Sequence, residues 1–264
     1  MTAKKYLWLL IILFILVVST MGHLFQLNSK PIKEKDYPEI KAFGALQVVM
    51  EYNTSDYYVE GNSIAGVQYE LCKYISQRSG LELNIRLENN LDTSIKDLQN
   101  KTVDIIARNI PITIENREIL AFTVPVTQNK QVLIQRITES EKDSVYIANQ
   151  IELAHKTIYL PEGSPAKFRI KNLSEEIAEP IYIKEIKEYA QEQLLYMVAL
   201  GEIDYAVIDK DIALKNKVKF PEIDMYLDIS FTQLQAWAVR KNSPILLDSL
   251  NTWIRDYQLT KTIQ

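Results

Sequence analysis

A short β-branched run that ends in a polar segment constrains this chain most. Residues 103–106 are mostly β-branched and apolar, which predicts a strand buried on both faces of a parallel sheet. Polar side chains follow this run, among them Arg108, Asn109, Thr113 and Arg117. Because open α/β sheets bind ligands at the carboxyl ends of their strands, these residues are candidates for a binding site. A solvated connection between a strand and a helix is the alternative.

The segments before this strand alternate between strand and helix patterns. Strands are expected at residues 46–52 and 81–87, and helices at 68–78 and 92–100. With residues 103–106 the order becomes β-α-β-α-β, which implies right-handed crossovers and a parallel sheet. These segments form the first lobe of the expected α/β fold.

A second α/β set follows an expected strand at residues 129–136. Its helices are expected at 147–155, 166–177 and 190–200, and its strands at 157–160, 181–183 and 205–208. The chain then returns through 227–231 to a strand at 234–240 in the first lobe and ends on a helix at 244–257. Two crossings between lobes predict a two-stranded hinge, and such a hinge permits closure around a ligand.

The amino-terminal residues predict a membrane segment. Lys4 and Lys5 precede an apolar run that reaches Phe25, about the 20 residues that span a bilayer. We expect an uncleaved anchor with the lysines in the cytoplasm, and a cleaved signal peptide is the alternative. No cysteine follows the run, which excludes a lipoprotein anchor.

The predicted domain boundaries follow from these patterns. Residues 1–25 are the anchor or signal, and residues 26–45, with alternating charges and two prolines, are expected to be a tether. Residues 46–130 and 230–264 form lobe 1, and residues 131–229 form lobe 2.

Composition and rare residues exclude several functions. A net charge of −4 gives no basic surface for nucleic acid. The single cysteine, Cys72, lies in a helical pattern and is expected in the core, and no disulfide can form within one chain. His23 lies in the predicted membrane segment and His155 at the end of a predicted helix, so we expect no Ser/His/Asp or metal cluster built on histidine. We therefore expect neither an enzyme nor a cofactor.

A signature follows the strand at residues 103–106. A V-D-x-I strand leads to T-x-E and then to an aromatic-Thr-x-Pro turn, and the matching positions are Asp104, Thr113, Glu115, Phe122, Thr123 and Pro125. From about residue 46 to its end, the chain resembles the family 3 extracellular solute-binding proteins. The resemblance implies an α/β, two-lobed type II periplasmic-binding-protein fold that closes on a small ligand.

The resemblance also implies ligand contacts in lobe 2. Gly163 and Ser164 match a loop whose amides hold a ligand carboxylate in the family, and free amides at a helix start do bind anions. An ordinary helix start explains the same residues, since Ser caps helices and Pro165 suits the first turn. Asp209 matches the aspartate that takes a ligand ammonium, although it could simply be a helix cap.

The first lobe departs from the family pattern at its arginine. The usual binding arginine directly follows T-x-E, but Asn116 stands there and Arg117 is one residue late. Arg108, in place of a small residue, is a second candidate, because a planar guanidinium binds both carboxylate oxygens. Glu51 and Tyr57 lie where the family places an acidic residue and a stacking aromatic. A plain surface loop is the alternative for these two.

The nearest resemblance is to the binding domain at the start of F-type membrane-bound lytic transglycosylases. It implies a protein on the periplasmic side of the inner membrane, held by its anchor or secreted to the periplasm. The ligand is expected to be an amino acid, a short peptide or a cell-wall peptide fragment, taken up for transport or sensing. An ABC transporter permease or peptidoglycan is the expected partner. The alternative is the regulatory domain of a transglycosylase whose catalytic domain lies outside this sequence.

Overall fold

The computed structural model describes residues 35–137, 146–187 and 189–262. Residues 36–264 belong to one compact unit. The expected anchor, residues 1–25, and the expected tether as far as residue 34 lie outside the described residues. None of the helices in the described part combines the length and the apolar character of a membrane span.

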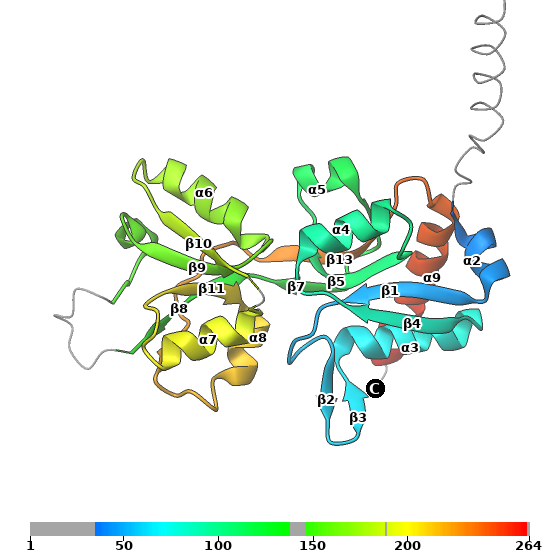
Figure 1. The fold of residues 1–264 in the computed structure, drawn as a ribbon, viewed down its shortest axis with the longest axis horizontal. Coiled ribbons are helices and arrows are strands. Elements are labelled where there is room, and N and C mark those ends of the chain that lie inside the picture. Colours follow the sequence, from blue (N-terminus) through cyan, green and yellow to red (C-terminus); the bar gives the residue numbers. More distant parts are fainter. Residues whose placement is uncertain (1–34, 138–145, 188, 263–264) are drawn as a thin grey trace, which may run out of the picture. The chain divides into compact units, whose positions relative to one another are not determined.

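Lobe 1 is built on a mixed six-stranded sheet (Figure 1). Its strand order is β4 (Glu82–Leu87), β1 (Ala45–Met50), β5 (Ile105–Pro111), β13 (Gln233–Val239) and β6 (Ala121–Phe122), with β7 (Thr127–Asn129) paired to β13. β1 is parallel to β4 and β5, as the β-α-β-α-β pattern predicts, and β13 returns antiparallel to β5. The surrounding elements are the hairpin β2 (Tyr58–Glu60) and β3 (Ser63–Ala65), and helices α3 (Val67–Ser79), α4 (Leu91–Gln99), α5 (Ile114–Ile119) and α9 (Pro244–Thr262).

Lobe 2 repeats this plan with five strands. Their order is β10 (Tyr182–Ile186), β9 (Thr157–Pro161), β11 (Ala206–Asp209), β8 (Gln131–Arg136) and β12 (Ile223–Asp224). Its helices are α6 (Ala166–Glu176), α7 (Gln191–Ala199) and α8 (Lys210–Asn216). The helix expected at residues 147–155 is wrong, because that segment holds only the 3-10 turn η1 (Gln150–Leu153). There Leu153 enters the core while Ile151 stays exposed, and Ile147 is buried before the turn begins, so the segment buries its two inward side chains without a full helix.

The chain passes between the two sheets twice. β7 leads into β8 through Lys130, and the returning chain reaches β13 after Ser230. β13 pairs with β7, and the Gln131 amide donates to the Ser230 hydroxyl at 2.9 Å.

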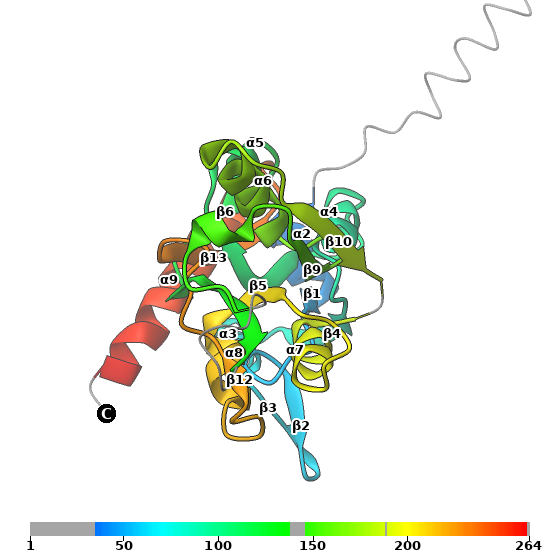
Figure 2. The ribbon, with the colours of Figure 1, turned by 90° about the vertical axis from the view of Figure 1, so that its left-hand side faces the viewer.

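Both views of the ribbon separate the helices around these crossings. Figures 1 and 2 place α4, α5 and α6 on one side of the strands, and α3, α7 and α8 on the other. The two lobes can therefore contact each other along two separate fronts.

The structure corrects the expected tether at residues 36–45. Helix α2 (Tyr37–Phe43) forms there, with Asp36 and Glu39 in a reciprocal capping box, a start signal that the charge pattern concealed. Ile40 is fully buried in the core of lobe 1. The Asp36 carboxylate also accepts the amides of Ile245 and Leu246 at the start of α9. Asp36 and helix α2 thus belong to lobe 1.

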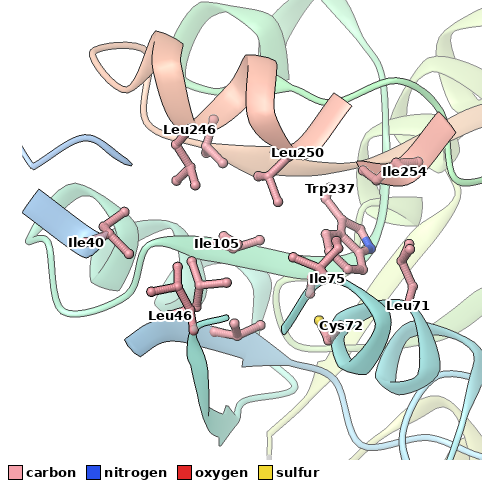
Figure 3. Close-up of a cluster of buried hydrophobic side chains, with 14 of the residues drawn as sticks. Ile40, Leu46, Leu71, Cys72, Ile75, Ile105, Trp237, Leu246, Leu250 and Ile254 are labelled. Atoms are coloured by element: carbon pink, nitrogen blue, oxygen red, sulfur yellow. The ribbon is translucent and has the colours of Figure 1, made fainter. Parts of the chain in front are cut away.

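Apolar side chains from both ends of the chain meet in the core of lobe 1. Figure 3 shows Leu246, Leu250 and Ile254 of α9 directed toward Trp237 and Ile105. Cys72 packs in the same cluster, as predicted, and burial raises the pKa of its thiol well above the usual value. A neutral, enclosed thiol of this kind acts as a small apolar residue.

Candidate ligand-binding site between the lobes

Five carboxyl groups meet where the strands of the two lobes end. Glu51 follows β1, Asp56 lies in the next loop, Glu192 is in the first turn of α7, and Asp209 and Asp211 lie at the start of α8. Glu51 and Asp56 belong to lobe 1 and the others to lobe 2. Burial is the largest cause of the raised pKa of Glu51, Asp56 and Asp209, and the charges of nearby carboxylates add to the rise. This group is called the acidic cluster below.

Arg108 is a buried cation of the acidic cluster. Its Nη2 lies 2.6 Å from Glu51 Oε2, and the two side chains are 6% and 8% exposed. Its Nη1 donates to the Asn89 carbonyl at 2.9 Å. Burial nevertheless raises the pKa of Glu51, and the charge of Arg108 only opposes this rise. Both partners of Arg108 lie in lobe 1.

Asp56 is held by amides. Its carboxylate accepts Nδ2 of Asn53 at 3.0 Å and Nδ2 of Asn109 at 3.1 Å. Asn109 accepts from Gln68, which in turn accepts the indole N–H of Trp237. Burial raises the pKa of Asp56 to about 7, and the Asn53 hydrogen bond does not offset it.

Asp209 stands at the end of β11 and the start of α8. As a helix cap it is unusual, because its side chain makes no capping hydrogen bond. Gln191 engages it instead, donating Nε2 to its carboxylate at 3.2 Å and accepting its amide at 2.7 Å. Burial raises the pKa of Asp209 to about 8, and the charges of Asp211, Glu51 and Asp56 add to the effect. A carboxylate in this setting favours a cationic partner.

Thr54 joins the two lobes beside the acidic cluster. Its amide and hydroxyl donate to Glu192 Oε1 at 2.7 and 3.1 Å. Asn216 Nδ2 donates to its hydroxyl oxygen at 3.3 Å, and Lys215 Nζ donates to its carbonyl at 3.0 Å. Thr54 of lobe 1 therefore forms hydrogen bonds to lobe 2 through its amide, its hydroxyl and its carbonyl. We call this set of contacts the Thr54 latch.

A cavity of about 320 Å³ lies on the other front, between α4, α5 and the start of α6. It reaches the crossing strands at Gln131 and Gln233. Three basic side chains, Lys167, Arg169 and Lys171, line it together with three acidic ones, Asp92, Glu115 and Glu185, and with Thr113, Asn116, Gly163 and Ser164. Lys167 pairs with Glu185 and Arg169 with Glu176. We call it the basic cavity, after its three basic residues.

The predicted amide loop closes this cavity but differs in detail. Gly163 has a φ of 72°, as its role requires, and an added Cβ would lie 3.0 Å from Asn90 Oδ1 of lobe 1. Its amide donates to Glu185 and that of Ser164 to the Pro161 carbonyl. Pro165, expected within the first turn, is the helix cap instead. Both amides thus have protein partners in this structure.

The remaining predicted residues are divided between the basic cavity, the acidic cluster and the exposed surface. Thr113 caps α5 and lines the basic cavity with Asn116, whereas Arg117 is exposed on α5 and does not line it. Tyr57 packs against Tyr69 and Tyr52, with ring centroids 5.5 and 6.5 Å away. Glu51, Arg108, Asn109 and Asp209 meet in or beside the acidic cluster.

Sequence reasoning missed Gln68, Gln191, Glu192 and Trp237 as parts of the site. Gln191 and Glu192 start the helix after β10, at the carboxyl end of a parallel strand. The rule that selected Arg108 would have selected these two as well.

A second opening of about 460 Å³ lies between the lobes next to Asn89 and Asn90. Tyr52 from lobe 1 and Tyr189 from lobe 2 line it with Glu88 and Glu162. Both tyrosines are nearly half exposed. Within the described ranges no group of His, Cys, Asp and Glu has the arrangement of a metal site.

Fold and site together define a two-lobed α/β binding protein, with its candidate site between the lobes. Residues 46–264 match the bacterial extracellular solute-binding proteins, family 3, and the chain belongs to that family.

Curated relatives carry a more specific name. The chain is 26% identical over 254 residues to the membrane-bound lytic murein transglycosylase F of Ectopseudomonas mendocina, covering 95% of this chain and 50% of the relative. The enzyme of the same name from Desulfosudis oleivorans is 27% identical over 215 residues, covering 81% and 45%. The chain thus spans about half the length of these relatives.

Solved structures show the same fold. A mutant of the arginine-binding protein ArgBP from T. maritima superposes with a TM-score of 0.74 at 24% identity, covering 85% of this chain and 94% of that chain. The holo form of ArgBP gives 0.70 at 25% identity, covering 84% and 94%. The two-lobed fold of the family is therefore confirmed.

Proposed function

We propose that this protein binds a small ligand carrying an ammonium group by closing its lobes, outside the cytoplasm, for transport or sensing. The observation that carries the proposal is the charge balance of the acidic cluster. Glu51 has Arg108, whereas in the described part of the chain Asp56 and Asp209 are engaged by amides and not by a cation. A buried carboxylate with a raised pKa gains most from a ligand cation.

The other end of the ligand is assigned to the basic cavity. Gln131 lines this cavity and is the strand partner of Asp209, so the two regions are neighbours. An amino acid or short peptide would direct its ammonium toward Asp209 and its carboxylate toward Lys167 and Arg169. Amino-acid binding by the neighbouring arginine-binding proteins supports this assignment. The family also makes an ABC transporter permease a fitting partner.

The second candidate is the ligand-binding domain of a membrane-bound lytic transglycosylase. The relatives of that name favour it, since their match to this chain covers about half their length. The opening lined by Tyr52 and Tyr189 favours a ligand larger than one amino acid, such as a peptidoglycan fragment. In this case ligand binding would regulate cell-wall cleavage.

A thermal-shift screen of amino acids, dipeptides and peptidoglycan fragments tests both candidates. A ligand at 100 times its dissociation constant stabilises the folded protein by about 2.7 kcal/mol. Each binder is then compared with its N-acetyl derivative, which lacks the ammonium charge. Equal binding of the two forms would contradict the proposed role of the acidic cluster.

The Thr54 latch predicts a uniform change in affinity. We expect Thr54→Val to weaken every ligand by roughly fivefold, because it removes two hydrogen bonds of about 1 kcal/mol or less each from the closed form only. Calorimetry over several ligands measures this, with Thr252→Val on the exposed face of α9 as the control. A loss confined to one ligand would show that Thr54 contacts the ligand and is not a latch.

A further inference from the structure

Arg108 has the surroundings of a bound ligand group. Its guanidinium is enclosed, 2.6 Å from a buried carboxylate and 2.9 Å from the Asn89 carbonyl. It arises from β5, whose preceding residue, Ala107, is fully buried. The guanidinium is thus anchored to a rigid central strand and is not carried by a mobile loop.

The charge of Arg108 acts on more than its direct partner. It opposes the rise in the pKa of both Glu51 and Asp56, two carboxyls of the acidic cluster. Because Glu51 and Asn89 both lie in lobe 1, the guanidinium keeps its place whatever the position of lobe 2. The cluster therefore contains one permanent cation before any ligand enters.

Removing the positive charge of Arg108 would change which ligands the site prefers. Glu51 would keep its buried position but lose the 2.6 Å partner, and a buried carboxylate without a partner is strongly unfavourable. A ligand bringing a second positive group could then replace the missing charge. A ligand with a single ammonium could satisfy Asp209 but would leave Glu51 unpaired.

We infer that Arg108 is a specificity-determining residue whose guanidinium stands where the second cation of a dicationic ligand would otherwise bind. The inference rests on the proposed function of the same site. Arg108 restricts the protein to ligands that carry one ammonium and no further cation near Glu51.

The test compares L-arginine with L-citrulline, which has nearly the same shape but an uncharged side-chain end. Calorimetry gives the ratio of the two affinities for the parent protein, for Arg108→Ala and for the control Arg86→Ala, whose arginine is half exposed beside Asp97. We expect the ratio of arginine affinity to citrulline affinity to be at least tenfold higher in Arg108→Ala than in the parent protein. In the control Arg86→Ala this ratio should be unchanged. In Glu51→Gln/Arg108→Met the gain should disappear, because no carboxylate remains at position 51.

A thermal readout serves if Arg108→Ala is too unstable for titration. Arginine should then raise its melting temperature and citrulline should not. An unchanged ratio, or equal stabilisation by both compounds, overturns the inference. Loss of both compounds from a variant that folds also overturns it, and would make Arg108 a contact for the ligand carboxylate. If the parent protein binds neither compound, the preference of Arg108→Ala for arginine over citrulline is measured directly in the variant, so the test does not depend on the outcome of the ligand screen.

Discussion

Replacing Asp209 by alanine is expected to weaken binding of an ammonium ligand by 30-fold or more. Truncating one partner of a buried charge pair typically costs about 2 to 5 kcal/mol in binding. Asp209, half-buried in the acidic cluster and engaged by the Gln191 amide, becomes one partner of such a pair once the ligand ammonium is bound. Calorimetry of Asp209→Ala and of the isosteric Asp209→Asn, with the tightest amine from the screen, measures the loss.

The same substitution is expected to leave folding stability unchanged or slightly higher. The Asp209 side chain makes no capping bond to α8, so the usual loss of about 1 kcal/mol for an N-cap does not apply. Removing the carboxyl also relieves repulsion from Asp211 and Glu51. Parent-like affinity in both variants would place the ligand ammonium elsewhere in the cluster.

The second large effect is a rise in affinity for a cationic ligand with pH. The pKa of Asp56 is about 7 and that of Asp209 about 8, so both are largely protonated at pH 5. A cation favours the ionised form, and its binding therefore releases protons. Affinity should climb by roughly tenfold per pH unit for each proton released, levelling off above pH 8.

The stability of the ligand-free fold should change in the opposite direction. A carboxyl whose folded pKa is raised binds more protons in the folded than in the unfolded chain between the two pKa values. For Asp209 that window extends from 3.8 to about 8, and unfolding becomes easier as pH rises through it. Denaturation at several pH values measures this, and Asp209→Asn should flatten the curve. A flat affinity profile in the parent protein would mean that the free lobes keep these carboxyls solvated.

The sheets were largely predictable because their strands satisfy two local rules at once. The segments that became β1 and β5 are rich in β-branched apolar residues and are buried on both faces, as a covered parallel strand requires. Helix α2 escaped prediction because its seven residues bury chiefly Ile40, too few for a periodic signal. The helix expected at residues 147–155 failed for the opposite reason. Its apolar residues suggested a helix, but Ile151 stays exposed and only a 3-10 turn forms.

The acidic cluster could be predicted only in part. Glu51 and Asp209 follow strands and could be placed by topology. The pairing of Thr54 with Glu192 joins residues 138 positions apart in different lobes, and no local pattern encodes such a contact. The sequence marks Arg108 as unusual. That Arg108 pairs with Glu51, and not with a ligand carboxylate, depends on burial, which the sequence does not show.

The hydrogen-bond chain from Trp237 to Asp56 gives this protein an internal optical reporter. The indole N–H, Gln68, Asn109 and the Asp56 carboxylate are linked in sequence, and the ring is fully shielded from water. A change in charge at Asp56 alters the electric field along the indole, whose emission colour depends on that field. Trp253 of α9 lies beside Tyr37 of α2, and the third tryptophan of the chain is Trp8. Replacing both Trp8 and Trp253 by phenylalanine would therefore leave Trp237 as the single tryptophan, and its fluorescence would report events between the lobes without an added label.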